Sequence, residues 1–324
     1  MVTEEQILKA LPNVLKTTDF DFGGKFVGKV RDTYILDDGR RVIVTTDRQS
    51  AFDYVLGEIP FKGAVLNQLA GFWFEKTSDI VDNHLISVPD PNVSIVKSCK
   101  GIPIEMIVRG YISGVTNTSI WGSYKKGERV IYGITFPEGL KKNQRLEEPV
   151  ITPTTHGDPS GQGGHDERLT RDEILKSDLV SSEIYLQMEK AAIKLFKRGS
   201  EIALKSGLIL VDTKYEFGLI DGELILMDEM HTPDSSRFWK ADSYQARFDK
   251  GEEPENFDKE FLRLWYAEKG YKGDGEPPKM SEELIVSLAK RYIEVYEKLT
   301  GKEFEVVEYP IEERIRANIE KALG

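Results

Sequence analysis

The chain has 324 residues, with 44 Lys and Arg against 55 Asp and Glu, so its formal net charge is −11. Hydrophobic residues make up 40% of it and charged residues 31%, which excludes a chain that is disordered throughout. The acidic balance argues against nucleic acid as a partner, because nonspecific binding needs a basic surface. The length predicts about two domains.

The sequence predicts a cytoplasmic protein with no membrane partner. No apolar run reaches the roughly 18 residues of a membrane span, and the acidic start, Met1 to Glu5, lacks the features of a signal peptide. Cys99 is the only cysteine, so no intramolecular disulfide can form, as expected in a reducing compartment. Without a partner pattern, Cys99 is not expected to be a nucleophile. The oligomeric state stays open.

Apolar spacing and turn residues predict hairpins and separate helices rather than a repeating parallel sheet, hence an α+β fold. The expected elements of the first half are a helix over 4–16, a hairpin of strands 26–36 and 42–46 closed at Asp37-Asp38-Gly39, a helix around 66–73 and a strand over 102–108. Those of the second half are a glycine-rich loop over 157–164, a helix opened by a capping box at Thr170–Glu173, a helix over 182–205 ended by Gly207, a hairpin of 208–217 and 224–229, and a helix over 281–299. We expect residues 1–110 to form a strand-rich N-terminal lobe and residues 111–324 an α+β C-terminal lobe.

Gly28-Lys29-Val30-Arg31 combines a glycine with two cations in a strand that leads into the first hairpin. Backbone amides can approach a phosphate at a glycine, and the flanking side chains can neutralise it. The segment is not a P-loop, because it has neither the GxxxxGK[ST] pattern nor a following helix. An exposed basic edge strand is the alternative interpretation.

The segment from Asp212 to Glu216 places charges inside an apolar strand, which a hairpin joins to Asp228. Carboxylates in such a strand must pair or bind an ion, and a few of them suit Mg²⁺ together with phosphate oxygens. A two-residue loop at Asp221-Gly222 would pair Glu216 with Met227, whereas a three-residue loop would set Glu216 opposite Asp228. We expect the three-residue loop, because a shared metal needs both carboxylates on one face. A ladder of structural Lys–Glu pairs is the alternative.

Two further segments offer anion ligands. His231 to Trp239 contributes hydroxyls and the Arg237 fork, and Ile107 to Gly114 contributes Arg109 beside two glycines. Either could clamp a phosphate or a carboxylate. An Asx/Ser turn and a domain hinge are the respective alternatives. The histidines around the glycine-rich loop show no HExxH or CxxC pattern, so zinc is not expected.

Together, these segments resemble the SAICAR synthases, the phosphoribosylaminoimidazole-succinocarboxamide synthases of purine biosynthesis. Seven pieces stand in the family's order, which makes coincidence improbable. They are GKVRDTY (28–34), TTDRQSAFD (45–53), LNQLAGFWF (66–74), IPIEMIVRGYISG (102–114), TPTTHGDPSGQGGHDE (152–167), VDTKYEFG (211–218) and DEMHTPDSSRFW (228–239). One position departs from the family, which commonly has a serine after the glycine that matches Gly114. This chain has Val115 there, and Thr116, Thr118 or Ser119 could supply the hydroxyl.

The resemblance implies a two-lobed fold with an ATP cleft between the lobes. It also implies an ATP-dependent ligase that joins a carboxyaminoimidazole ribotide to L-aspartate, with Mg²⁺ as cofactor and small molecules as partners. The residues fit that chemistry, because a carboxylate must be activated, as an acyl phosphate, before an amine can attack it. Such a step needs a metal and cations around the phosphates and clamps for the anionic substrates.

The resemblance also implies roles for individual residues. The catalytic candidates are Lys214, which would stabilise charge on the transferred phosphoryl group, and Asp212. Glu216 and Asp228 are the expected Mg²⁺ ligands. The expected ATP contacts are Gly28, Lys29, Val30 and Arg31 over the phosphates, with Ile102 and Glu105 near the adenine. The expected substrate contacts are Arg109, Arg237 and Ser235 at the ribotide phosphate, with Asp47, Ser50, His165, Asp166 and Glu167 lining the substrate or aspartate pocket.

Two other functions are compatible with these residues. An ATP-dependent kinase of a small phosphorylated alcohol could use the same scaffold, since fold does not determine function. It would need a hydroxyl acceptor, whereas the ligase needs an amine. A nucleotide sensor that does not turn ATP over has little reason to keep Arg109 and Arg237 beside metal-binding carboxylates.

Overall fold

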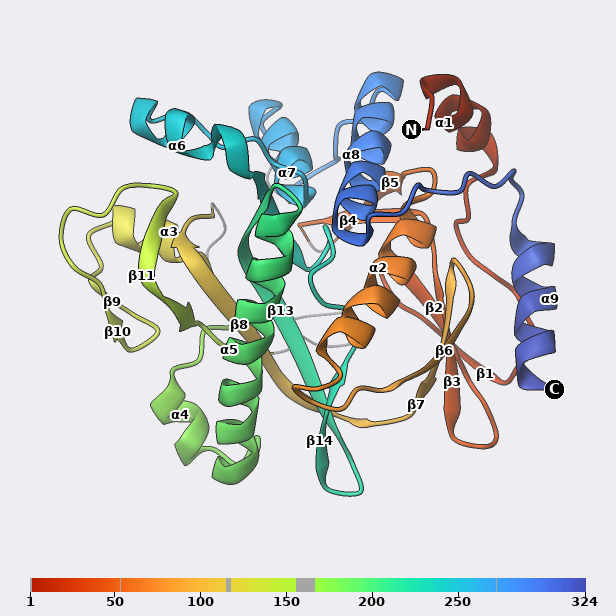
Figure 1. Cartoon of the computed structure of the whole chain (residues 1–324), viewed down its shortest axis with the longest axis horizontal. Helices are drawn as coiled ribbons and strands as arrows, with labels where there is room; N and C mark the ends of the chain where they lie inside the picture. The colour runs from red at the N-terminus through yellow and green to blue at the C-terminus, as the bar shows by residue number, and fades with distance from the viewer. Residues whose placement is uncertain (1, 53, 115–117, 156–166, 272) are drawn as a thin grey trace.

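The computed structural model describes residues 2–52, 54–114, 118–155, 167–271 and 273–324 (Figure 1). It has an α+β fold, as expected, with two main antiparallel sheets and helices on their faces. The five-stranded first sheet has the order β1 (Gly24–Val27), β2 (Arg31–Ile35), β3 (Arg40–Thr45), β7 (Val93–Lys97) and β6 (Leu85–Asp90). The six-stranded second sheet has the order β11 (Gln144–Ile151), β8 (Lys100–Ile112), β13 (Leu208–Ile220) and β14 (Glu223–Met227), with β12 (Thr154–Thr155) on β8 and β15 (Ser236–Lys240) on β13.

Two short strand pairs and the helices complete the described part of the chain. The pairs are β4 (Arg48–Ala51) with β5 (Tyr54–Glu58) and β9 (Val130–Ile131) with β10 (Ile134–Thr135). The helices are α1 (Glu4–Ala10), the 3₁₀ helix η1 (Leu11–Asn13), α2 (Lys62–Thr77), α3 (Ile120–Lys125), α4 (Arg171–Lys176), α5 (Ser182–Lys205), α6 (Ala241–Lys250), α7 (Lys259–Glu268), α8 (Glu282–Thr300) and α9 (Glu312–Leu323). Among the described residues, no helix is both long and apolar enough to cross a membrane.

The local signals at helix ends behave as expected. Thr170 and Glu173 form the predicted capping box of α4, with each side chain accepting from the other residue's backbone N–H. The predicted helix over 182–205 is α5, and Gly301 ends α8 in a left-handed conformation. The first helix is shorter than predicted, because Pro12 cannot continue it and the chain tightens into η1.

The predicted strand 26–36 is in fact two strands. β1 ends at Val27 and β2 begins at Arg31, so Gly28, Lys29 and Val30 form the turn between them. The Gly28 N–H closes this turn on the carbonyl of Arg31 at 2.8 Å. The placement of these residues inside a strand was therefore wrong, and they form an exposed hairpin tip instead.

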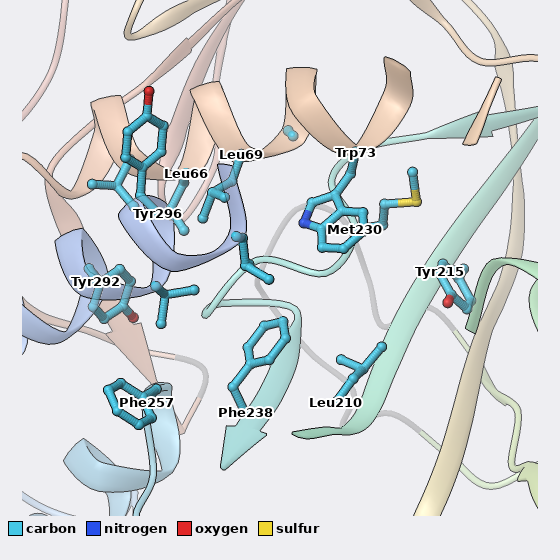
Figure 2. Packing of buried hydrophobic residues seen from close by; sticks show 14 of the residues in the cluster. Leu66, Leu69, Trp73, Leu210, Tyr215, Met230, Phe238, Phe257, Tyr292 and Tyr296 are labelled. Atoms are coloured by element: carbon cyan, nitrogen blue, oxygen red, sulfur yellow. The ribbon is translucent and has the colours of Figure 1, made fainter. Parts of the chain in front are cut away.

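Each main sheet packs in its own core cluster: a large cluster joins α2, α5 and α8 to β8 and β13, and a smaller one packs the first sheet against α9. The apolar face of α5 covers β8 and β13 (Figure 1), and Trp73 of α2 lies beside Met230, whereas Leu66 and Leu69 lie on the side of Tyr296 (Figure 2). At the other end of the chain, α9 buries Ile315 against the first sheet. Residue 110, the expected lobe boundary, lies inside β8, and the division at that residue stays a prediction.

Candidate active site

Strand β13 carries the predicted charges on one face of the second sheet. Side chains alternate along a strand, so Asp212, Lys214 and Glu216 share a face. Tyr215 and Phe217 point to the opposite face and are fully buried in the core. Strand alternation therefore separates a polar, ligand-facing side of β13 from a side that packs in the interior.

Lys214 lies between two carboxylates on that face. Its Nζ is 2.7 Å from Glu105 Oε1 and 2.5 Å from Glu216 Oε1, and β8 and β13 pair these two glutamates directly. Burial acts to lower the pKa of Lys214, but the carboxylates of Glu216 and Glu105 outweigh it and hold the pKa well above its ordinary value. Lys214 is therefore an ammonium group that supplies positive charge rather than a base.

Arg31 reaches this cluster from the first sheet. Its guanidinium bonds to Asp228, just after β14, and its Nη2 lies 3.1 Å from Glu229 Oε1. Burial acts to raise the pKa of Asp228, but the positive charges of Arg31 and Lys214 outweigh it and hold the pKa below its ordinary value. That carboxylate is therefore ionised. For Glu229, burial prevails and raises the pKa. The structure thus brings the predicted residues Arg31, Lys214 and Asp228 into one electrostatic cluster with Glu216.

The predicted hairpin register was wrong, although both carboxylates still face the same cations. Asp221-Gly222 forms a two-residue loop with φ values of 52° and 86°, so Glu216 pairs with Met227 rather than with Asp228. An Asp-Gly pair favours this primed turn, because its twist matches the strands. Asp228 would then face away, but β14 ends at Met227 and Asp228 takes a left-handed φ of 63°. This kink, and not the strand register, directs its side chain to the cluster.

The donor set of this cluster suits a magnesium ion bound together with phosphates. Among the described residues, no group of three or more His, Cys, Asp and Glu side chains is arranged to hold a metal on its own. Glu216 and Asp228 supply two carboxylates, and Mg²⁺ typically takes one or two carboxylates and completes its shell with phosphate and water oxygens. Both residues already balance Lys214 and Arg31, so the cluster can exchange partners when charges enter.

A second cluster lies two residues along β13. Asp212 pairs in register with Arg109 of β8 and Arg237 of β15. Its Oδ2 accepts from Arg109 Nη1 at 3.1 Å and from Arg237 Nη1 at 2.8 Å. Arg237 Nε also lies 3.7 Å from Glu260, which pairs with Arg263. Arg109 and Arg237 share the single carboxylate of Asp212, and such a pair of guanidinium groups suits an anionic ligand such as a phosphate.

A glycine lies directly against the guanidinium group of Arg237 in this second cluster. Gly114 has a φ of 94°, and a Cβ there would come within 2.9 Å of both terminal nitrogens of Arg237. Arg109 is held from the same side, since its Nε donates to Thr152 Oγ1 at 2.8 Å and its Nη2 to the Thr118 carbonyl at 3.3 Å. Residues 115–117, which include the Val115 departure and Thr116, lie outside the described part. Ser119 is buried and N-caps α3.

The other predicted site residues are placed less uniformly. Ser235 joins the site, because its carbonyl accepts from the Lys214 N–H at 3.0 Å. Ser50 Oγ lies 3.4 Å from Lys259 Nζ. Glu167 is exposed beside Thr155, and His165 and Asp166 lie outside the described residues.

Three more of the expected contacts stay predictions. Ile102 packs in the apolar core, and Glu105 lies beside Lys214 in the charged cluster. Asp47 is enclosed in the scaffold. Its oxygens accept from Leu15 N at 2.9 Å, Gly63 N at 3.0 Å and Tyr309 Oη at 2.9 Å, and burial raises its pKa to about 6. These contacts do not support a substrate-lining role for Asp47.

The sequence reasoning missed a third charged group. Asp234 Oδ2 lies 2.9 Å from Nζ of Lys62 and 3.0 Å from Nζ of Lys259, and its Oδ1 accepts from Tyr292 Oη at 2.6 Å. All four side chains are buried or nearly so. Asp234 stood inside a quoted motif, but no local pattern connects it to a lysine 172 residues away.

The family model, the related sequences and the solved structures all match this chain to the same family. Residues 25–279 match the family described as SAICAR synthetase. A phosphoribosylaminoimidazole-succinocarboxamide synthase of Legionella pneumophila (strain Paris) is 52% identical over 97% of this chain and 100% of its own length. A solved SAICAR synthase from Saccharomyces cerevisiae in complex with SAICAR has a TM-score of 0.76 and 34% identity, covering 90% of this chain and 99% of that chain.

A solved SAICAR synthetase in complex with ADP has a TM-score of 0.65 and 25% identity, covering 87% of this chain and 100% of that chain. Fold, site and relatives together define an α+β enzyme of the ligase class. The match over residues 25–279, with relatives similar along nearly the whole chain, establishes that the chain belongs to the SAICAR synthetase family.

Proposed function

We propose that the protein joins 5-amino-1-(5-phosphoribosyl)imidazole-4-carboxylate to L-aspartate, giving SAICAR, ADP and phosphate in de novo purine biosynthesis. The observation that carries this proposal is the arrangement along one face of β13. On that face, the ammonium group of Lys214 lies between two carboxylates. Two residues away, the carboxylate of Asp212 lies between two guanidinium groups. The first cluster suits phosphoryl transfer and the second suits a bound phosphate monoester.

The reaction needs activation of the ribotide carboxylate, and we propose an acyl phosphate. A carboxylate oxygen attacks the γ-phosphorus of ATP and ADP leaves. The aspartate amine then attacks the acyl carbon and loses a proton, and inorganic phosphate leaves. Lys214 is held as an ammonium and can face the charge on the transferred phosphoryl oxygens, where a fixed cation is most effective.

Glu216 and Asp228 are the proposed holders of Mg²⁺, which when bound neutralises charge on the ATP phosphates. The turn Gly28–Arg31 would cover these phosphates from the first sheet, across a cleft between the lobes. This turn is held in shape by Arg48, which donates to the Lys29 and Gly28 carbonyls at 3.0 Å each. The Arg31 guanidinium then links the cover to the metal-binding carboxylates.

Arg109 and Arg237, with Ser235 beside them, are the proposed ligands of the ribotide phosphate. Both arginines pair with Asp212, which stands two residues before Lys214 on β13. The phosphate of the ribotide would therefore bind beside Asp212, and its carboxylate would extend toward Lys214. The single cysteine, Cys99, cannot form an intramolecular disulfide, which supports a reducing, cytoplasmic setting.

The test is ADP release by the purified protein with Mg-ATP, the ribotide and L-aspartate, each omitted in turn. We expect turnover that needs all three and an amide product with the mass of SAICAR. ADP release that continues without the amine would contradict the ligase and favour a kinase. Tight Mg-ATP binding without any turnover would favour a sensor.

A further inference from the structure

A buried hydrogen bond ties β13 to the segment that follows β14, behind the site. The hydroxyl oxygen of Tyr215 lies 2.6 Å from Nε2 of His231, and both side chains are fully buried. Tyr215 stands between Lys214 and Glu216 but points to the opposite face of the sheet. His231 stands three residues after Asp228. The bond therefore connects the two chain segments that carry the proposed metal ligands.

The backbone of His231 and two packed elements restrict its side chain. The backbone φ is 51°, and the ring meets the Trp73 ring edge-to-face with 4.6 Å between the ring centroids. Helix α5 passes so closely that a Cβ at Gly199 would lie 2.3 Å from His231 Cε1. Figure 2 shows Trp73 extending from α2 beside Met230, the residue before His231, with Tyr215 on β13 on the other side of Met230. Such packing leaves the ring little freedom to move away from Tyr215.

The strand ladder cannot hold Asp228 in this way. The register between β13 and β14 begins with Glu216 and Met227, and Asp228 lies beyond it with a left-handed backbone. The next backbone link from β13 to this segment is the bond from Lys214 N to the Ser235 carbonyl at 3.0 Å. Between those two points, the Tyr215–His231 bond is the side-chain tether on the core side of β13 among the described residues.

We propose that Tyr215 and His231 form a positioning pair, which sets the distance between the Glu216 and Asp228 carboxylates and thereby the affinity of the site for magnesium-bound nucleotide. Both residues act through others, because neither faces the ligand side of the sheet. The inference rests on the proposed function for the identity of the metal ligands. His231 Nδ1 has no hydrogen-bond partner among the described residues, so the bond at Nε2 is the polar anchor of the ring there.

The test compares Tyr215→Phe, which removes one oxygen atom, with His231→Leu and the double variant. ADP binding is measured by calorimetry with and without Mg²⁺. We expect each single change to weaken Mg-ADP binding about three- to tenfold, the usual effect of one lost hydrogen bond. Binding of ADP in EDTA should stay unchanged. The double variant should be no weaker than the single variants, because both remove the same bond.

The control is Tyr124→Phe in a different core cluster, whose hydroxyl donates to the Pro137 carbonyl at 2.7 Å and accepts from Leu140 N at 3.0 Å. It should lower the melting temperature without changing Mg-ADP affinity. Folded Tyr215→Phe protein with a lower melting temperature but wild-type Mg-ADP affinity would overturn the proposal. His231→Gln tests the same point independently, since recovery of affinity by a side chain that can bond Tyr215 supports positioning.

The same measurements separate this inference from the proposed function. Wild-type protein that binds Mg-ADP but makes no amide would contradict the ligase and leave the coupling testable. Ligation that is intact in wild type, with equal Mg-ADP affinity in all variants, would contradict the positioning pair alone.

Discussion

Arg109 and Arg237 lie on the strands either side of β13 and donate to the same oxygen of Asp212, at 3.1 and 2.8 Å. Two buried guanidinium groups would repel each other without an intervening carboxylate. Asp212 therefore holds the two cations together, and this arrangement favours a positioning role for Asp212 over a direct part in the chemistry. Held side by side, the two guanidinium groups are arranged to bind a phosphate.

Replacing Arg237 by alanine should weaken the ribotide more than the nucleotide. The change removes a charged donor from the proposed phosphate site, so the KM for the ribotide should rise about 10- to 100-fold, with little change in the KM for ATP. Steady-state kinetics with each substrate varied provides the measurement. Arg198→Ala is the control, because its exposed ion pair with Asp79 lies outside the site. Equal effects on both KM values would contradict the assignment.

A methyl group at Gly114 should act on the same site, because its Cβ would press on Arg237 and on Ser119 Cβ, 2.7 Å away. The new Cβ would come within 2.9 Å of the guanidinium, and we expect a rise of about tenfold or more in the KM for the ribotide. Gly127→Ala is a matched control, since Gly127 has a similar φ of 98° but no atom within 4 Å of the built Cβ. Both changes strain the backbone. If both variants bind the ribotide equally well, steric displacement of Arg237 is ruled out.

Removing the Glu216 carboxylate should raise the magnesium requirement. Glu216→Ala leaves Lys214 facing Glu105 alone and takes away one proposed metal ligand. We expect turnover to fall at least about 100-fold at low magnesium, with partial recovery as Mg²⁺ is increased. The assay is ADP release over a magnesium titration, with Glu223→Ala, an exposed position on the same hairpin, as control. An unchanged magnesium profile would exclude Glu216 as a ligand.

Asp258 should make the protein less stable as the pH rises toward neutrality. Burial raises its pKa to about 7, from an ordinary value of 3.8, while its oxygens accept from Phe238 N and Glu260 N at 2.7 Å each. The folded state then binds a proton that the unfolded chain has released. The stabilisation is complete below about pH 4 and is lost as the pH rises through about 7, on the order of 4 kcal/mol.

Asp258→Asn removes that titration, and its free energy of unfolding should fall less between about pH 5 and pH 7 than that of the wild type. Urea unfolding at several pH values measures the slope. Asp37→Asn, at an exposed turn, should follow the wild type. Parallel slopes for Asp258→Asn and wild type would show that Asp258 is already ionised over this range.

The local signals in the sequence were sufficient for much of the fold. Apolar periodicity predicted α5 and α8, the capping box predicted the start of α4, and Asp221-Gly222 marked the hairpin after β13. These features depend on neighbours within a few residues, which is why one sequence can indicate them. Three local expectations were wrong: the first helix is shorter, strand 26–36 is two strands, and Asp221-Gly222 forms the two-residue loop that an Asp-Gly pair favours.

The sequence by itself determined which residue types share a face: the alternation of Asp212, Lys214 and Glu216 puts them on one side of β13, and the resemblance to known motifs supplied their expected chemistry. The folded chain determined how they are held. The left-handed backbone of Asp228, the pairing of Lys62 with Asp234 and the tether from Tyr215 all join residues distant in sequence or depend on a single backbone kink. Such contacts form only when whole helices and strands pack against one another, and a pattern within a few residues does not determine that packing.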